Sequence, residues 1–425
     1  MKSKMFAVCA GLAAVSIACL PAQAADDDQL PDSFVANMQH YSVLGSSIAA
    51  GGVLGKRSTG SLLGIDSLPN WSSYFYYPGV IDPLGDPQFT WSYTMVGNSP
   101  FGEGGEDGHG STTINAPLVP VTVDLRNFDG SPRFVNGHRL ISSPAAFVHP
   151  VLSSPIFQNS RYDSSDRPTQ FTDAVQRAEF SSADDGWHTI LRPSTKTGRT
   201  MVLIRGTYRY ALNADGTCCK FILVDIGAFV NALFPPGLGD TSTVIGQAET
   251  AGDVRTTDLS TFLFPNTFLY LNGNPSNCCV IGFHTYDLEP GDAQNGWRER
   301  RYVMNYSSWV SPGIFRDPTF TDVAPLSHEL AETFNDPFVN NSTPWWLSPN
   351  GNCQNNLETG DVIEGLPNAN HPITLDGVTY HPQNEALLQW FAGQTPSSAI
   401  GHAYSYPDKT ILTTASKSRK YGCAP

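Results

Sequence analysis

The chain has 425 residues, of which only 15% are charged, and its formal net charge at pH 7 is −14. An acidic surface of this kind excludes nucleic acid and anionic membranes as partners recognised by charge. The 38 glycines and 32 prolines, together with 40% hydrophobic residues, are typical of a loop-rich globular protein and exclude a disordered chain.

The N-terminus has the pattern of an export signal. Lys2 and Lys4 precede an apolar run at 5–20, and an Ala-Gln-Ala sequence ending at Ala24 supplies a cleavage site of small residues. We therefore expect residues 1–24 to be a signal peptide and the protein to be secreted or periplasmic. The apolar run is shorter than the roughly 20 residues that a membrane span needs, so no stable membrane anchor is expected.

Removal of the signal peptide would leave six of the eight cysteines: Cys218, Cys219, Cys278, Cys279, Cys353 and Cys423. An even number of cysteines in an exported protein favours disulfides. We expect the doublets 218–219 and 278–279 to cross-link to each other, and Cys353 to pair with Cys423. A zinc site with thiolate ligands is the alternative.

Along the chain, residues 25–110 are predicted to be extended and irregular, and residues 111–425 to form one α+β domain. Apolar and β-branched runs predict strands at 118–126, 200–212, 219–227, 266–272, 278–287 and 300–310. Helical spacing of apolar residues predicts helices at 168–180, 227–234 and 384–393. Because the strands crowd the centre, we expect a central mixed or antiparallel sheet.

One further helix, at 323–336, carries the motif with the most chemistry. Its sequence at 327–337 is SHELAETFNDP. Pro325 suits the first turn of a helix, and Pro337 ends the helix because the residue before a proline leaves the α conformation. His328 and Glu332 are four residues apart and therefore share one face.

This spacing predicts a metal site. Zinc in hydrolases has three protein ligands and one open position for water, and His328 and Glu332 would supply two of the ligands. Glu329 would lie beside the ion as general base, and Asp361 is the preferred third ligand. Zinc is the expected ion, although carboxylate ligands also suit calcium or another divalent ion. The alternatives for the third ligand are Asp336, His371 and His381.

A purely structural interpretation competes with this one, because short helices with one histidine and several glutamates commonly bind nothing. The acidic segment around Asp361 also contains Glu358 and Glu364. His284 falls within the predicted strand at 278–287, and we interpret it as a packed core histidine. The pair Trp345–Trp346 is interpreted as an aromatic lid, or as a platform for a sugar or peptide.

The sequences SHELAETFNDPFVNN, PWW and CQNNLETGDVIEG, between Ser327 and Gly365, resemble the C-terminal part of the plant exordium, or phosphate-induced, secreted proteins. The wider region 110–425 resembles large exported bacterial proteins of unassigned function. The resemblance carries over to His328, Glu329, Glu332 and Asp361, and implies a zincin-like domain with a sheet edge above the motif helix. The exordium-type cysteine after Gly-Asp is replaced here by Val362 or Ile363.

Three functions follow as hypotheses. The first is a secreted metallopeptidase in which Glu329 activates water for attack on a peptide carbonyl. The second is a non-catalytic exported binding or cell-surface protein with a structural metal ion. The third is a hydrolase of a cell-surface polymer such as a glycan, for which Trp345 and Trp346 would form the platform.

Overall fold

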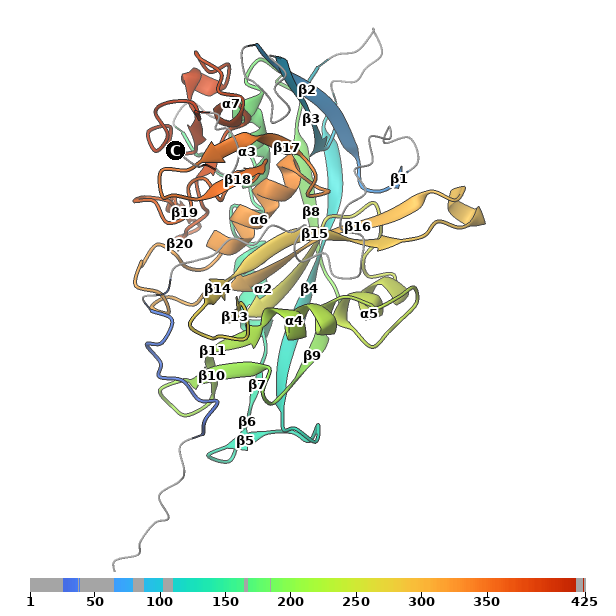
Figure 1. The fold of residues 1–425 in the computed structure, drawn as a ribbon, viewed down its shortest axis with the longest axis vertical. Helices are drawn as coiled ribbons and strands as arrows, with labels where there is room; N and C mark the ends of the chain where they lie inside the picture. Colours follow the sequence, from blue (N-terminus) through green and yellow to red (C-terminus); the bar gives the residue numbers. More distant parts are fainter. Residues whose placement is uncertain are drawn as a thin grey trace, which may run out of the picture.

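The computed structural model describes residues 26–36, 38, 65–78, 88–101, 110–163, 167–183, 185–417 and 423 (Figure 1). The expected signal peptide at residues 1–24 lies outside these ranges. No helix within them is long and apolar enough to cross a membrane.

A mixed eight-stranded sheet occupies the centre of the molecule (Figure 1). Its main path runs β1 (Ile65–Asp66), β16 (Glu299–Trp309), β12 (Ser260–Pro265), β4 (Thr112–Arg126) and β7 (Ile141–Ser142). Three strands pair beside this path: β15 (Gly282–Glu289) with β16, and β8 (Thr189–Thr195) and β9 (Arg199–Ile204) with β4. Only β15–β16 and β4–β7 are antiparallel. The mixed sheet is confirmed, and the antiparallel alternative is wrong.

A second sheet has the order β10 (Tyr208–Leu212), β11 (Cys218–Asp225), β13 (Thr267–Tyr270) and β14 (Cys278–Val280). The single strand predicted at 200–212 is therefore wrong, because its first half is β9 of the central sheet and its second half is β10. Gly206 lies between the halves with φ of 93°, a left-handed conformation that glycine adopts without steric cost.

The described residues contain six α-helices: α2 (Ala145–Leu152), α3 (Phe171–Glu179), α4 (Ile226–Leu233), α5 (Val244–Thr250), α6 (Ala324–Asn335) and α7 (Leu388–Phe391). Helices α3, α4 and α6 confirm the predictions at 168–180, 227–234 and 323–336. The helix predicted at 384–393 is reduced to α7, because Glu385 and Ala386 instead pair as β21 with β22 (Ser405–Tyr406).

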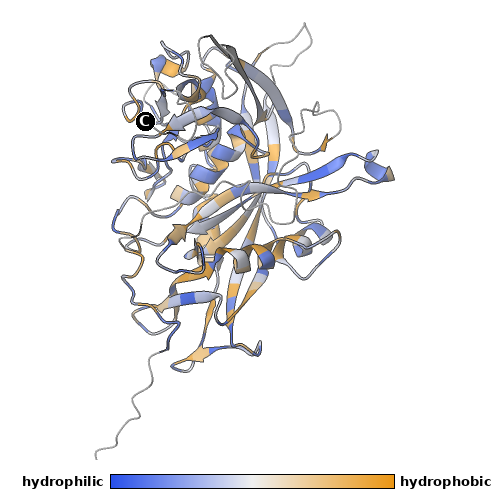
Figure 2. Cartoon of the chain, viewed as in Figure 1, coloured by the Kyte–Doolittle hydropathy of each residue, from blue (hydrophilic) through white to orange (hydrophobic). Residues whose placement is uncertain are grey.

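The remaining strands are short or form hairpins: β2 (Asn70–Pro78) with β3 (Gln88–Val96), β5 (Phe134–Val135) with β6 (His138–Arg139), β17 (Ser342–Leu347) with β18 (Cys353–Asn356), and β19 (Ile373–Leu375) with β20 (Val378–Tyr380). The hairpin β2–β3 is regular over nine residue pairs, in the region where sequence predicts irregular structure. Figure 2 shows apolar strands through the middle of the molecule and a hydrophilic projecting end of the β15–β16 hairpin.

Helix α6 is buried on every side, including its polar residues. Leu326, Leu330 and Phe334 pack into one apolar cluster with Val175 of α3 and Val303 of β16. Burial of each such side chain contributes roughly 1.5–3 kcal/mol to folding. This packing holds α6 against the central sheet, so its remaining face is presented to β15 and to the segment after β18.

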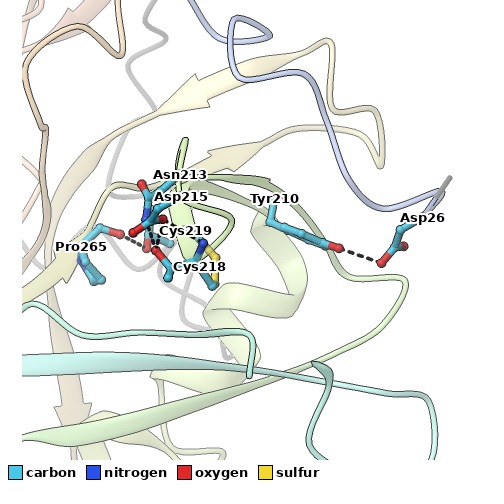
Figure 3. The surroundings of a disulfide bond; sticks show 9 residues. Asp26, Tyr210, Asn213, Asp215, Cys218, Cys219 and Pro265 are labelled. Atoms are coloured by element: carbon cyan, nitrogen blue, oxygen red, sulfur yellow. Dashed lines mark hydrogen bonds between the residues drawn. A yellow bond between two sulfur atoms is a disulfide. The ribbon is translucent and has the colours of Figure 1, made fainter. Parts of the chain in front are cut away.

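The disulfides confirm one prediction and correct the other. Cys353 and Cys423 are bonded, with their Cα atoms 5.7 Å apart. Each doublet, however, is bonded within itself, as Cys218–Cys219 (Figure 3) and Cys278–Cys279. The sheet order explains why the doublets cannot meet. Strand β13 lies between β11 and β14 in the sheet. Cys278 is aligned, through Tyr270 of β13, with Asp225 at the end of β11, whereas Cys218 and Cys219 are at its start, about 20 Å away along the strand.

Candidate metal centre

Helix α6 brings His328 and Glu332 together as the spacing predicts. The Nε2 atom of His328 lies 3.1 Å from Oε2 of Glu332. The other ring nitrogen, Nδ1, lies 3.2 Å from Oε1 of Gln383. The amide group of Gln383 is oriented by its own Nε2, which donates to the carbonyl oxygen of Gly360 at 2.8 Å. His328 Nδ1 therefore donates to Gln383, and Nε2 is left as the nitrogen that faces the carboxylates.

Asp361 reaches this pair from the segment after β18. Its Oδ1 lies 3.5 Å from His328 Nε2, and Gln354 of β18 donates to its Oδ2. The backbone N–H groups of Gly360 and Asp361 donate to Oε1 of Glu332 at 3.1 and 3.2 Å. One oxygen of Glu332 is thus fixed by the backbone, and the other faces the histidine. The expected trio of His328, Glu332 and Asp361 is assembled.

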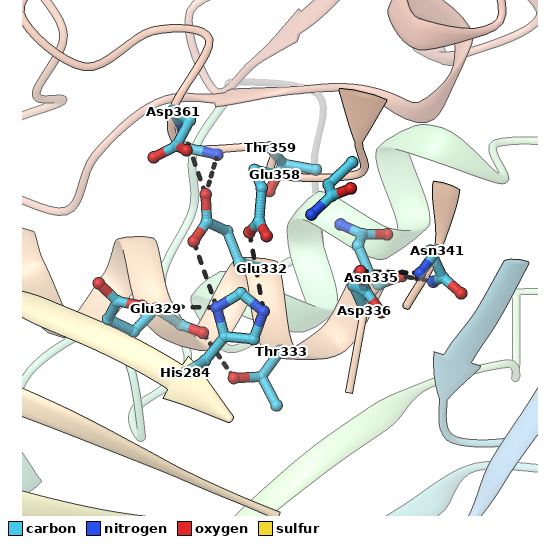
Figure 4. A network of polar contacts seen from close by, with 12 residues as sticks. His284, Glu329, Glu332, Thr333, Asn335, Asp336, Asn341, Glu358, Thr359 and Asp361 are labelled. Atoms are coloured by element: carbon cyan, nitrogen blue, oxygen red, sulfur yellow. Dashed lines mark hydrogen bonds and ion pairs between the residues drawn. The ribbon is translucent and has the colours of Figure 1, made fainter. Parts of the chain in front are cut away.

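A second histidine, His284 of β15, completes the cluster (Figure 4). Its Nδ1 lies 3.4 Å from Oε2 of Glu332 and 3.5 Å from Oε2 of Glu329. Its Nε2 lies 3.7 Å from Oε2 of Glu358. His284 is buried, as expected for a core histidine, but its polar atoms face the carboxylates of the site. Sequence reasoning missed His284 and Glu358 as site residues. The acidic segment around Asp361 is the only sequence signal for Glu358.

Two glycines make space for the cluster. A Cβ atom on Gly360 would lie 2.5 Å from Nδ1 of His328, and one on Gly282 would lie 2.5 Å from Oε1 of Glu329. Real Cβ atoms do not approach other atoms so closely, so any side chain at these positions would displace a residue of the site. Close approach of backbone to functional side chains is a common reason for glycine.

The alternative third ligands have other roles. The carboxylate of Asp336 accepts the N–H groups of Asn340 and Asn341 at 2.9 and 3.0 Å, just beyond the end of α6. His381 Nδ1 lies 2.7 Å from Asp322 Oδ2. Within the described ranges, neither these residues nor His371 belongs to a group of side chains that could hold a metal ion.

The cluster concentrates negative charge away from water. None of its six residues is more than 7% exposed: His284, His328, Glu329, Glu332, Glu358 and Asp361. Within the described part of the chain, no lysine or arginine forms an ion pair with Glu329, Glu332 or Glu358. Unpaired buried carboxylates are costly, so the cluster requires a positive counter-charge.

Without an ion, protons on the histidines supply that charge. Burial lowers the pKa of His328, but Glu332 and the other carboxylates more than reverse this, so the pKa is well above its ordinary value. The pKa of His284 is raised in the same way, chiefly by Glu358. Burial raises the pKa of Glu358 well above its ordinary value, and Glu332 raises it further. Burial acts in the same direction on Glu332, but the two histidines together hold its pKa below the ordinary value.

The geometry fits a divalent cation. One ligand atom from each of His328, Glu332 and Asp361 lies within 4.8 Å of the others, and His284, Glu332 and Glu358 form a second such group. Imidazole with carboxylate is a donor set used by zinc and other first-row transition metals, whereas calcium takes oxygen ligands. Among the described residues, the third group that could hold an ion is Glu249, Asp287 and Glu289, near the projecting hairpin.

Comparisons with known proteins give no assignment: no family model, no curated protein and no solved structure matches this chain.

Proposed function

We propose that this protein is an exported metal-dependent hydrolase that cleaves peptide bonds, with zinc or a similar divalent ion held by His328, Glu332 and Asp361. The observation that carries the proposal is the convergence of these three side chains from α6 and from the segment after β18. A bound ion supplies a Lewis acid that polarises a water molecule and a substrate carbonyl. We propose in addition that the site is zincin-like, and this part of the proposal is supported only by the sequence motif of helix α6.

Glu329 is assigned the role of general base. It follows His328 on α6, and its carboxylate is oriented toward His284 at the same cluster (Figure 4). Burial raises the pKa of Glu329, and the two histidines oppose that effect. A carboxyl in such surroundings can accept a proton from water and deliver it to a leaving amine. Gly282 keeps the space around Glu329 free of a side chain.

A test begins with the mature protein, from Ala25, stripped with a chelator and reloaded with zinc. Unfolded casein and a mixed peptide library serve as substrates, with and without chelator. We expect chelator-sensitive cleavage that falls by about 10²–10⁴-fold in Glu329→Gln, while the bound zinc stays unchanged. Glu179→Gln is the matched control, because Glu179 is also a buried glutamate but lies outside the cluster, and it should keep full activity. Cleavage that survives in Glu329→Gln would contradict the role of Glu329.

One observation favours the second candidate, a binding or cell-surface protein with a structural ion. The side chains of the cluster are nearly inaccessible, so a substrate reaches them only after the surrounding segments move. Structural zinc sites are closed, whereas catalytic sites keep a position open for water. A protein that demonstrably holds its ion and cleaves nothing in the same assay would establish this candidate instead.

A further inference from the structure

We propose that the cluster holds two adjacent divalent ions, one at His328 and Asp361 and the other at His284 and Glu358, with Glu332 shared between them. This inference rests on the proposed metal site and extends it, since that site needs only one ion. Figure 4 shows His284, Glu332 and Glu358 facing one another, with Asp361 on the other side of Glu332.

The first argument is the position of Glu332. Its Oε2 atom lies 3.1 Å from His328 Nε2 and 3.4 Å from Nδ1 of the His284 ring, whose other nitrogen, Nε2, is the one offered to the second ion. Its Oε1 atom is occupied by the N–H groups of Gly360 and Asp361. The two groups that could hold an ion have only Glu332 in common. A single carboxylate oxygen placed between two ligand sets can bridge the ions of a two-metal site, which lie about 3.5–4 Å apart.

The second argument is the spacing of the ligand atoms. Zinc binds nitrogen and oxygen at about 2.0–2.2 Å with tetrahedral geometry, so its ligands lie about 3.3–3.6 Å from one another. Nε2 of His328 lies 3.5 Å from Oδ1 of Asp361. Nε2 of His284 lies 3.7 Å from Oε2 of Glu358. The first distance falls within this range. The second is slightly above it and is too long for a hydrogen bond.

The third argument is unsatisfied polarity. Nε2 of His284 and Oε1 of Glu358 have no hydrogen-bond partner, although both residues are only 2% exposed. Buried polar atoms of this kind are rare in folded proteins and call for a partner. Both atoms lie in the half of the cluster that the ion at His328 and Asp361 would leave unfilled.

The fourth argument is charge. When ionised, Glu329, Glu332 and Glu358 carry three negative charges, and among the described residues no lysine or arginine forms an ion pair with any of them. One divalent ion would balance two of these three charges, and a second ion would balance the third. Charge balance within a buried site is the condition under which such carboxylates can stay ionised.

The test is a measurement of metal stoichiometry on the full mature chain. The protein is stripped with a chelator, reloaded with Co²⁺ or Zn²⁺, freed of excess metal by gel filtration and analysed for metal per chain. We expect two ions in the wild type and one ion in each of His284→Ala, Glu358→Gln and His328→Ala. Glu358→Gln preserves size and serves if His284→Ala fails to fold, and Glu179→Gln should keep both ions. Loading with Mn²⁺ should give the spectrum of a spin-coupled pair, which requires adjacent ions.

The outcomes separate this inference from the proposed function. One ion in the wild type that His328→Ala removes and His284→Ala retains would overturn the second ion and leave the single metal site intact. One ion in the wild type that is lost in both His284→Ala and His328→Ala would also overturn the inference, because both histidines would then bind the same ion. No bound ion in the folded wild type would remove both proposals.

Discussion

The carboxyl of Glu179 offers a quantitative test of how burial acts in this fold. Glu179 ends α3 and is 1% exposed. Its Oε1 accepts the N–H of Leu388 at 3.0 Å, while its Oε2 has no hydrogen-bond partner. No ion pair is formed with it in the described part of the chain. Burial raises the pKa of Glu179 to about 8, and the Leu388 hydrogen bond only partly offsets this.

The magnitude follows from linkage between protonation and folding. In the unfolded chain the Glu179 carboxyl ionises at its ordinary pKa of 4.5, and in the folded protein it ionises at about 8. Below pH 4.5 the carboxyl is protonated in both the folded and the unfolded state, so its burial as an ion does not lower the free energy of unfolding. Between the two values the unfolded state binds fewer protons, so the free energy of unfolding decreases as pH rises. The pKa difference corresponds to at most about 5 kcal/mol, at 1.36 kcal/mol per pKa unit.

Glu179→Gln removes the ionisation and keeps the shape of the protonated acid. Urea unfolding at intervals between pH 5 and pH 8.5 gives the free energy of unfolding for wild type and variant. We expect similar values near pH 5 and a variant that is more stable by several kcal/mol at pH 8.5. Asp185→Asn, at a side chain that is 74% exposed, should show no such trend. A constant difference between Glu179→Gln and wild type over this range would refute the reasoning.

Two further perturbations test how the C-terminal segment supports the cluster. Replacing both Cys353 and Cys423 with serine opens a loop of 70 residues, and urea unfolding should show a loss of about 4 kcal/mol; a loss below about 1 kcal/mol would count against the bridge. Gly360→Ala should displace His328 and lower the bound metal per chain, whereas Gly110→Ala, where a Cβ meets nothing within 4 Å, should not. Full metal content in a folded Gly360→Ala protein would contradict the close packing at this glycine.

The elements that sequence predicts well are those that depend on neighbours along the chain. Helix α6 runs over Ala324–Asn335, close to the predicted 323–336, because proline positions its first turn and ends it. The spacing of His328 and Glu332 places them on one face in any α-helix, whatever surrounds it. The helix predicted at 384–393 failed because pairing of β21 with β22, a contact with residues twenty positions later, overrode its local preference.

The candidate site was predictable only in its helical part. The acidic segment that contains Glu358 and Asp361 predicts a ligand from this part of the chain, but no local pattern places that segment against α6. Gln383, which orients His328, has no motif of its own. Its role depends on a contact across 55 positions of the chain, so only folding reveals it.

The sequence by itself determined helix α6, the common face of His328 and Glu332, and the strands β4, β11, β13 and β16, since helical and strand periodicities act over a few residues. Only the tertiary structure decided that His284 of β15 faces the same cluster. That depends on which strand lies beside α6 and on which side of the strand the residue points. It also decided that each cysteine doublet bonds within itself, because β13 lies between β11 and β14. The order of strands in a sheet is fixed by packing of the whole chain, and no local pattern encodes it.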